Sequence, residues 1–212
     1  MADIVLYGIP MSTYVRSARM ACVEKGVPYT LEPVMPHSEP INALHPFGKI
    51  PAMRHSDFTL YETSAIMRYI DDAFEGPRLT PSNTRGRARM EQWISTFNAY
   101  FDSALIRRIV VQYAFPSGPD GKPDRAIIDK AAEDAKKQMA LLDEALDEGP
   151  FILGANISLA DLLLAPMMAY FVRTPEGKAI TAASKNLQRS GAAMRARKSY
   201  LETVPPPPPK RD

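Results

Sequence analysis

The stretch His45-Pro46-Phe47-Gly48-Lys49-Ile50-Pro51-Ala52-Met53 carries the most information about the fold of this chain. Proline restricts the residue before it to extended conformations, so Ile50 is expected to be extended as it enters Pro51. The Ile50-Pro51 bond can also be cis at tolerable cost, a form that peptide bonds rarely adopt except before proline. A cis bond would turn the N–H and C=O groups of Ile50 outward, free to bind a small peptide. The alternative is an ordinary turn built from proline and glycine.

The composition is that of a globular protein in a reducing compartment. The chain has 212 residues, of which 45% are hydrophobic and 24% charged, enough for one large domain or two small ones. A net charge of +2 gives no reason to expect nucleic acid or a membrane as a partner. The single cysteine, Cys22, excludes an intramolecular disulfide. The sequence has no membrane-spanning run and no signal-peptide pattern, so we expect a cytoplasmic protein.

The first half of the chain mixes strand and helix patterns. Strands are predicted for four short apolar runs, residues 4–7, 28–34, 51–54 and 58–61. Helices are predicted where apolar residues recur at intervals of three and four, over residues 12–25 and 62–74. The first strand, helix and second strand together form a βαβ unit.

Beyond residue 84 the strand patterns nearly disappear. Long amphipathic helices are predicted over residues 85–115 and 125–148, and a capping box at Ser158 and Asp161 begins another. We therefore expect a mixed domain over 1–76, a linker over 77–84 and an all-helical domain over 85–204. The five consecutive prolines in residues 205–212 predict a disordered tail.

A second candidate site lies where the first helix begins, at Ser12. In Tyr7-Gly8-Ile9-Pro10-Met11-Ser12-Thr13 a strand ends, a Gly/Pro turn follows and a hydroxyl residue opens the helix. The N-terminus of a helix carries unpaired N–H groups and a positive partial charge, which stabilise a thiolate. Cys22 lies about three turns further along, on the apolar spacing, so it is expected in the core and the thiolate has to come from a substrate. Ser12 would donate a hydrogen bond to it, or only cap the helix; both roles are compatible.

A third candidate site follows the last predicted strand, at Tyr61-Glu62-Thr63-Ser64. Hydroxyls and free backbone N–H groups at a helix start suit a ligand carboxylate, and the Glu62 carboxylate suits a ligand ammonium. The alternative for Glu62 is an acid that stabilises the helix dipole. Taken together, the three sites describe a receptor for a short thiol peptide with a free α-amino acid end, which is glutathione.

These motifs resemble the cytosolic glutathione S-transferase family, and the N-terminal part is most similar to the phi class, in a bacterial-type member. The matching motifs are Pro10-Met11-Ser12-Thr13 with Arg16, Glu24-Lys25-Gly26-Val27, Pro46-Phe47-Gly48-Lys49-Ile50-Pro51-Ala52, Tyr61-Glu62-Thr63-Ser64-Ala65-Ile66-Met67-Arg68-Tyr69-Ile70 and Ser158-Leu159-Ala160-Asp161. They span residues 3 to 175, and their order and spacing together are specific. The resemblance implies a thioredoxin-like α/β N-terminal domain of order βαβ-α-ββα and an all-α helical-bundle C-terminal domain.

The resemblance also implies roles for single residues. Ser12 falls on the family's catalytic serine, which lowers the pKa of the glutathione thiol. Pro51 falls on the cis-proline, and Ile50 on the residue whose backbone pairs with the cysteinyl unit. Glu62 and Thr63 fall on the acid and the hydroxyl that hold the γ-glutamyl group, although the family more often has serine at the second position.

Other matches are implied for the loop before Pro51. Lys49 falls where a Gln or Lys contacts the tripeptide backbone, and His37 lies near the basic residue that holds the glycyl carboxylate. His45 replaces the usual Asn before Pro46, which is interpreted as a tolerated change. Phe47 resembles the aromatic key that inserts into a partner subunit, which implies a homodimer; the alternative is that Phe47 packs within its own domain.

The resemblance predicts a detoxification enzyme that conjugates the glutathione thiolate to a hydrophobic electrophile. One alternative is a non-catalytic glutathione-binding interaction module, which would have no need of a thiol activator at Ser12. Another is a thiol-disulfide reductase, which would need a cysteine at the position of Ser12. No metal site is expected, because His37, His45 and His55 show no ligand spacing. Candidate residues for the electrophile pocket are Ile9, Met11, Tyr14, Tyr100, Phe101 and Tyr113.

Overall fold

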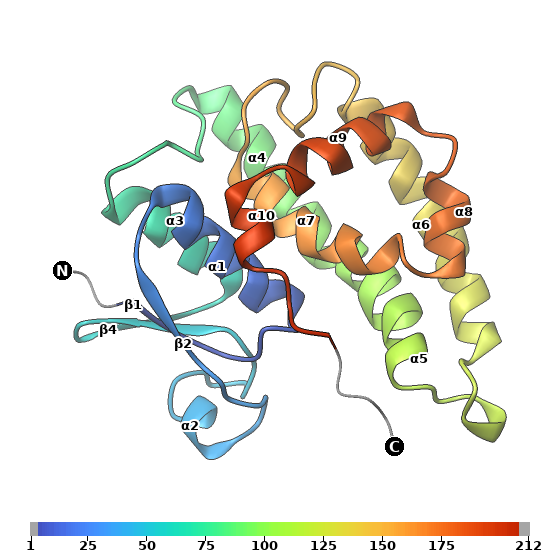
Figure 1. Ribbon diagram of the computed structural model, residues 1–212, viewed down its shortest axis with the longest axis horizontal. Coiled ribbons are helices and arrows are strands. Elements are labelled where there is room, and N and C mark those ends of the chain that lie inside the picture. The colour runs from blue at the N-terminus through green and yellow to red at the C-terminus, as the bar shows by residue number, and fades with distance from the viewer. Residues whose placement is uncertain (1–3, 208–212) are drawn as a thin grey trace. The chain divides into compact units, whose positions relative to one another are not determined.

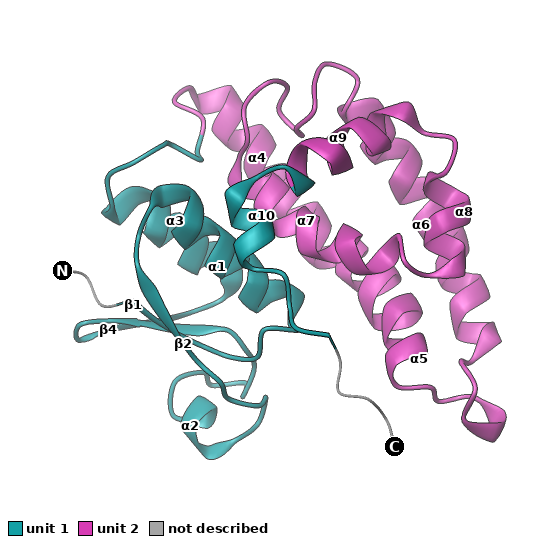
Figure 2. Cartoon of the chain, viewed as in Figure 1, with its two compact units in different colours: residues 1–80, 195–212 teal, residues 81–194 magenta. Residues whose placement is uncertain are grey.

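The computed structural model describes residues 4–207, which form two compact units (Figure 2). Of the described residues, 4–80 and 195–207 make up one unit (the sheet unit), and 81–194 make up the other (the helical unit). The sequence-based division placed 85–204 in one helical domain, whereas residues 195–204 pack within the sheet unit. The predicted tail begins at the end of the described part, and residues 208–212 lie outside it. Within residues 4–207, every helix is too short or too polar to span a lipid bilayer.

The sheet unit has the predicted thioredoxin-like order βαβ-α-ββα (Figure 1). Its strands are β1 (Ile4–Tyr7), β2 (Tyr29–Glu32), β3 (Ala52–His55) and β4 (Phe58–Tyr61). Its helices are α1 (Thr13–Lys25), α2 (Glu39–Asn42), α3 (Thr63–Ala73) and, from the C-terminal segment, α10 (Lys198–Glu202). The strands lie in the order β2-β1-β3-β4, with β1 and β2 parallel and β3 antiparallel to both of its neighbours. The α2 helix has only four residues, too few to show a periodicity in the sequence.

The strand register aligns three chain segments at one end of the sheet. Tyr7 at the end of β1 pairs with Ala52 at the start of β3, and Ala52 pairs with Tyr61 at the end of β4. The turn after β1, the loop before β3 and the start of α3 therefore leave the sheet at the same edge. These are the three segments that carry the predicted site residues.

Helix α1 forms as its sequence predicts. Ser12 is the N-cap, and its side-chain oxygen accepts a hydrogen bond from the N–H of Val15 at 3.3 Å. Gly26 ends the helix at a φ of 70°, which glycine adopts without strain. Cys22 is fully buried in the core, as predicted, and burial raises the pKa of its thiol to about 12.

The C-terminal segment packs on α1 through Arg16 and Glu24. The Arg16 guanidinium is buried, lies 4.3 Å from the ring centroid of Tyr200 and donates to the Tyr200 carbonyl at 3.0 Å. Arg197 donates to both carboxylate oxygens of Glu24, at 2.7 and 2.6 Å. These bonds join residues more than 170 positions apart in the sequence and explain why the segment belongs to the sheet unit.

The other helices of the described residues belong to the helical unit, apart from the last residue of α9 (Figure 1). They are α4 (Thr84–Thr96), the π-helix η1 (Phe97–Val110), α5 (Val111–Ala114), the 3₁₀ turn η2 (Pro119–Gly121), α6 (Arg125–Ala145), α7 (Leu159–Phe171), α8 (Pro175–Thr181) and α9 (Lys185–Arg195). The predicted helix over residues 85–115 corresponds to α4, η1 and α5 in succession. Its central part, η1, is a π-helix and winds more widely than an α-helix, as the backbone bond from the Val111 N–H to the Ile106 carbonyl, five residues earlier, shows.

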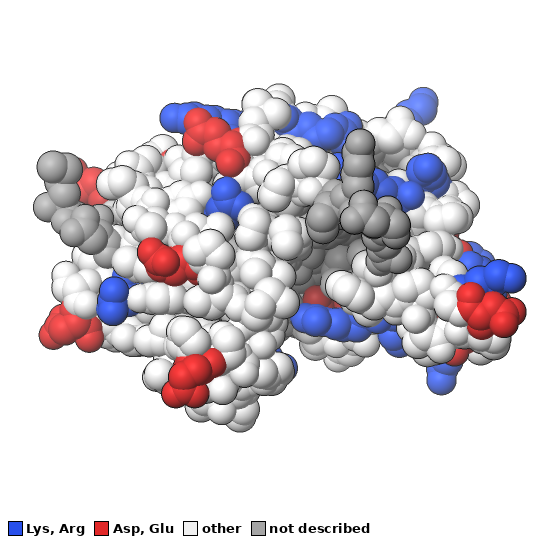
Figure 3. All heavy atoms as spheres, turned by 60° about the horizontal axis from the view of Figure 1, so that its bottom comes forward, with Lys and Arg blue, Asp and Glu red and all other residues white. Residues whose placement is uncertain are grey.

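Figure 3 shows how the charged side chains are distributed on one face of the molecule. On the face in Figure 3, acidic and basic groups are scattered among uncharged ones. This distribution agrees with the near balance of 26 Lys and Arg against 24 Asp and Glu. It offers no extended surface of one sign on that face for a nucleic acid to bind.

The predicted capping box at the start of α7 forms and is buried. Asp161 accepts hydrogen bonds from the Ser158 N–H and the Ile152 N–H, both at 2.8 Å, and from the Ser158 hydroxyl at 2.7 Å. Asp161 therefore fixes both the helix start and the loop before it.

We predict that Asp161→Ala lowers the free energy of unfolding by about 2–4 kcal/mol, because two buried N–H groups lose their acceptor. Urea unfolding followed by circular dichroism measures this loss. Asp129→Ala removes an exposed carboxylate from α6 and should change the value by less than about 1 kcal/mol. Equal effects of the two substitutions would contradict the role assigned to the capping box.

Candidate active site

Two of the three segments at the end of the sheet meet at Gly8. A methyl group added to Gly8 would lie 3.2 Å from the Cβ of Ile50 and 2.4 Å from a methyl carbon of Val15. Gly8 also has a φ of 150°, which side-chain-bearing residues rarely adopt. The glycine thus lets the turn after β1 approach both Ile50 and the first turn of α1. The sequence identified this turn but not the close contact that requires its glycine.

Ser12 is placed for both roles that the sequence allowed. The Val15 N–H occupies one acceptor position of the hydroxyl, so Ser12 caps α1. The hydroxyl proton is a separate donor and remains able to bond an anion. Ser12 is half-buried, at the positive end of a helix of 13 residues. The side chain therefore sits where a bound thiolate would be stabilised by the helix and by one hydroxyl donor.

The Ile50-Pro51 peptide bond is cis, as predicted. Pro51 is buried at the entry to β3, and Ile50 is half-buried outside the strand. Among residues 4–207, no hydrogen bond is found at the backbone N–H or C=O of Ile50. Both groups are thus available to an extended peptide laid beside the loop.

Glu62 and Thr63 open α3 at the same edge of the sheet. Glu62 has a φ of 69° and a ψ of 115°, a strained backbone for a residue with a side chain. Its side chain is exposed and forms no capping bond, so it does not serve as an ordinary N-cap. The first bond of the helix runs from the Ile66 N–H to the Glu62 carbonyl at 2.9 Å. The N–H groups of the turn before Ile66 therefore have no carbonyl partner earlier in the helix and point out of its end.

His37 and Lys49 lie on either side of Gly48. The His37 N–H donates to the Gly48 carbonyl at 2.7 Å, and a methyl group on Gly48 would lie 2.5 Å from the His37 Nδ1. Gly48 has a φ of 60°, so both space and backbone require glycine there. Both His37 and Lys49 are exposed. The structure thus places His37 against the loop that carries Lys49, and its role toward the glycyl carboxylate stays a prediction.

Comparison with known proteins gives one family over both halves of the chain. Residues 6–78 match the family "Glutathione S-transferase, N-terminal domain", and residues 125–189 match "Glutathione S-transferase, C-terminal domain". Glutathione S-transferase 3 of Zea mays is 31% identical to the chain, with 98% of each chain covered. The chain belongs to the glutathione S-transferase family.

Solved structures of the family have the same fold. Poplar glutathione transferase F1 superposes with a TM-score of 0.86 at 27% identity, covering 96% of this chain and 97% of that one. The theta-class glutathione S-transferase of Xanthomonas axonopodis pv. citri, solved with glutathione bound, has a TM-score of 0.82 at 26% identity over 96% and 98%. The F-series relatives agree with the predicted resemblance to the phi class.

Two candidate pocket residues of this transferase make contacts within the helical unit instead. Phe101 is fully buried in the helical unit, and its ring meets the Phe97 ring edge-on with centroids 5.0 Å apart, so it is a core residue. The Tyr113 hydroxyl lies 2.9 Å from a carboxylate oxygen of Glu176 and accepts from Arg125 at 3.2 Å. Burial and the Glu176 carboxylate raise the pKa of Tyr113. Tyr113 thus ties α5 to α6 and α8 within the helical unit.

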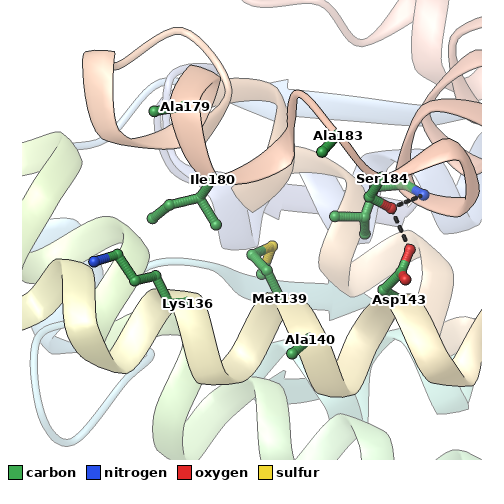
Figure 4. A pocket seen from close by; sticks show the side chains of 9 residues that line it. Lys136, Met139, Ala140, Asp143, Ala179, Ile180, Ala183 and Ser184 are labelled. Carbon is green, nitrogen blue, oxygen red and sulfur yellow. Dashed lines mark hydrogen bonds between the residues drawn. The ribbon is translucent and has the colours of Figure 1, made fainter.

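A cavity of about 450 Å³ lies between α6, α8 and α9 (Figure 4). Its walls are mostly apolar, with Met139 on α6 facing Ile180 on α8. The polar groups at one end, Ser184 and Asp143, are hydrogen-bonded to each other. It contains none of the residues predicted for the site.

Among residues 4–207, no three His, Cys, Asp or Glu side chains are placed together to hold a metal ion.

The backbone at Glu62 generates a prediction about stability. Glycine tolerates a positive φ and alanine does not, so Glu62→Gly should be more stable than Glu62→Ala by about 1 kcal/mol. Urea unfolding of the two variants measures the difference, and the lost carboxylate cancels between them.

The matched control is Asp72, an exposed residue near the end of α3 with helical backbone. There the order should reverse, with Asp72→Gly less stable than Asp72→Ala by about 1 kcal/mol. If alanine proved better than glycine at both positions, Glu62 would not have the strained backbone described here.

Proposed function

We propose that this glutathione transferase binds glutathione across the end of its sheet and ionises the thiol beside Ser12 for attack on a hydrophobic electrophile. The observation that supports the proposal is the register that joins Tyr7, Ala52 and Tyr61. It brings the three segments proposed to meet the thiol, the peptide backbone and the amino-acid end to one edge of the sheet. Glutathione carries its free α-amino acid end and its thiol on neighbouring residues joined by a peptide bond, so one molecule would reach all three segments.

Each part of the tripeptide would have its own partner. The Ile50 backbone beside Pro51 would pair with the cysteinyl unit, as one strand pairs with another. Glu62 would accept the γ-glutamyl ammonium, and Thr63 and the end of α3 would hold its carboxylate. Lys49 and His37 would meet the tripeptide backbone and the glycyl carboxylate, because both are exposed on the loop beside Gly48.

Ser12 would act on the thiol in two ways. Its hydroxyl would donate to the sulfur, a bond that is stronger to a thiolate than to a neutral thiol. The positive end of α1 favours the same charged form. Both effects lower the pKa of the bound thiol and raise the fraction of reactive thiolate, and holding the electrophile nearby adds the gain from proximity.

The alternatives fit the structure less well. A binding-only module would have no need of a hydroxyl donor at the start of α1. A thiol-disulfide reductase would need a reactive cysteine there, but the chain has Ser12, and Cys22 is buried with its thiol pKa raised to about 12.

Phe47 supports a proposed homodimer. Its side chain is 65% exposed although it is large and apolar, which suits insertion into a partner subunit. We also infer a cytoplasmic, bacterial-type enzyme of detoxification. The similarity to the Xanthomonas enzyme and the buried free cysteine support that setting.

We predict that Ser12→Ala raises the pKa of the thiol of bound glutathione by about one unit or more. The same change should lower kcat/KM with an aryl halide at least about tenfold. The pH profile of kcat/KM and the thiolate absorbance of the complex measure the two effects. Loss of the cap should cost only about 1 kcal/mol, so the variant should remain folded.

Ser17→Ala is the matched control, because it removes a buried hydroxyl from the same helix, and within residues 4–207 that hydroxyl bonds the Thr13 carbonyl alone. That variant should leave the thiol pKa unchanged. Full activity of Ser12→Ala would remove the role given to Ser12, and absence of glutathione binding at millimolar concentration would overturn the proposed function.

A further inference from the structure

His45 is a buried polar residue that the site described above does not use. It follows α2 and immediately precedes Pro46, at the start of the loop that leads to β3. Its side chain is 3% exposed. A buried imidazole in a loop needs a specific partner, because an unbonded buried polar group is costly.

One partner of His45 is the backbone of its own loop. The Phe47 N–H donates to the His45 Nδ1 at 3.2 Å. Since Nδ1 is the acceptor, the imidazole is neutral and carries its proton on Nε2. A side-chain acceptor that receives the N–H two residues on is the pattern of an Asx turn, in which an Asn or Asp oxygen plays this part. The His45 side chain therefore reinforces the turn over Pro46 as an Asn would, beside the backbone bond from the Gly48 N–H to the His45 carbonyl at 2.8 Å.

The second partner lies on β4. The rings of His45 and Tyr61 stack with centroids 4.7 Å apart and planes 39° apart, and the Phe47 ring meets the imidazole edge-on at 6.0 Å. Tyr61 directly precedes the strained Glu62. His45 thus joins the loop that carries Lys49 and Ile50 to the strand end that carries Glu62.

We propose that neutral His45 is a positioning residue for the glutathione site, and that protonation of His45 weakens glutathione binding. The proposal rests on the proposed function. Protonation puts a hydrogen on Nδ1, so the ring can no longer accept from the Phe47 N–H and two donors face each other. The turn over Pro46 then keeps its backbone bond from the Gly48 N–H to the His45 carbonyl at 2.8 Å but loses its side-chain bond, so residues 47–50 are held less firmly against Glu62.

The charges around His45 set the direction of the pH effect. Burial lowers the pKa of His45, the Glu62 carboxylate opposes that shift and the Lys49 ammonium adds to it. The Tyr61 phenol packs on the ring, and the imidazole of His37 lies against the same loop at Gly48. Because the pKa is below its usual value near 6.5, His45 is neutral at pH 7 and becomes charged only as the pH falls below that value. An imidazolium there would also compete with the ligand ammonium for Glu62.

The test is calorimetric titration with S-methylglutathione, whose sulfur cannot ionise, from about pH 7.5 to about pH 5. The wild-type protein should lose about tenfold in affinity over this range. His45→Asn keeps an acceptor for the Phe47 N–H but does not titrate, so it should bind as well at pH 7.5 and lose much less at pH 5. His45→Ala should bind roughly fivefold more weakly at pH 7.5 and be similarly insensitive to pH.

His37→Asn separates the two histidines of the loop. Asn tolerates the positive φ of 61° at this position, and the variant should keep the acid loss whatever its affinity. Wild type and His45→Asn both retain Glu62, so their comparison reports the change at position 45. Circular dichroism at each pH confirms that each variant is folded. If His45→Ala does not fold, the comparison of wild type with His45→Asn is enough for the test.

Identical pH profiles for wild type and His45→Asn would overturn the role of His45 while leaving the glutathione site in place. If His37→Asn no longer lost affinity at low pH, the loss would depend on His37, and the role of His45 would also be overturned. Absence of binding by wild type at pH 7.5 would instead overturn the proposed function itself.

Discussion

The pairing of Tyr7 with Ala52, and of Ala52 with Tyr61, is the constraint on which the rest of the site depends. Side chains alternate between the two faces of a sheet, so a slip of one residue would move buried groups such as Leu6 and Met53 to the opposite face. The apolar core therefore fixes the register. The register in turn fixes which loop ends meet at the edge of the sheet, and the chemistry of the site follows from that arrangement.

The position of α1 depends on its contacts with α3 and with the C-terminal segment. Lys25 at its C-terminus forms an ion pair with Asp71 of α3 at 3.2 Å, and both side chains are buried. Arg16 and Glu24 bind the C-terminal segment through Tyr200 and Arg197. Breaking such buried pairs is costly, since each would leave an uncompensated charge in the core. The helix that presents Ser12 is thus held along its length, which suits a group that has to meet a substrate sulfur accurately.

Local sequence predicted the parts of the site whose conformation is decided within a few residues. Ser12 as a cap, Gly26 as a helix end and the capping box at Asp161 each depend on neighbours in the chain, and the structure has all three. The local sequence allowed the cis bond before Pro51, and the family resemblance implied it. The resemblance to a known family added the residue roles, because no local pattern connects Ser12 with Glu62.

What the sequence did not predict depends on contacts between distant residues or on small differences in winding. The Arg16–Tyr200 contact joins positions 184 apart, so the helical spacing of neither segment indicates it. The wide winding of η1 leaves an apolar spacing that an α-helix also explains. His45 was interpreted as a tolerated replacement for Asn, because its acceptor geometry toward Phe47 is visible only when the turn over Pro46 is built.

A crystal structure of this transferase with glutathione bound would place every part of the tripeptide against the sheet edge at once. The account predicts the sulfur within hydrogen-bond distance of the Ser12 hydroxyl, the cysteinyl backbone paired with Ile50 and the γ-glutamyl group at Glu62 and Thr63. Glutathione bound at the same edge with its sulfur turned away from Ser12, or bound at another place on the molecule, would contradict it.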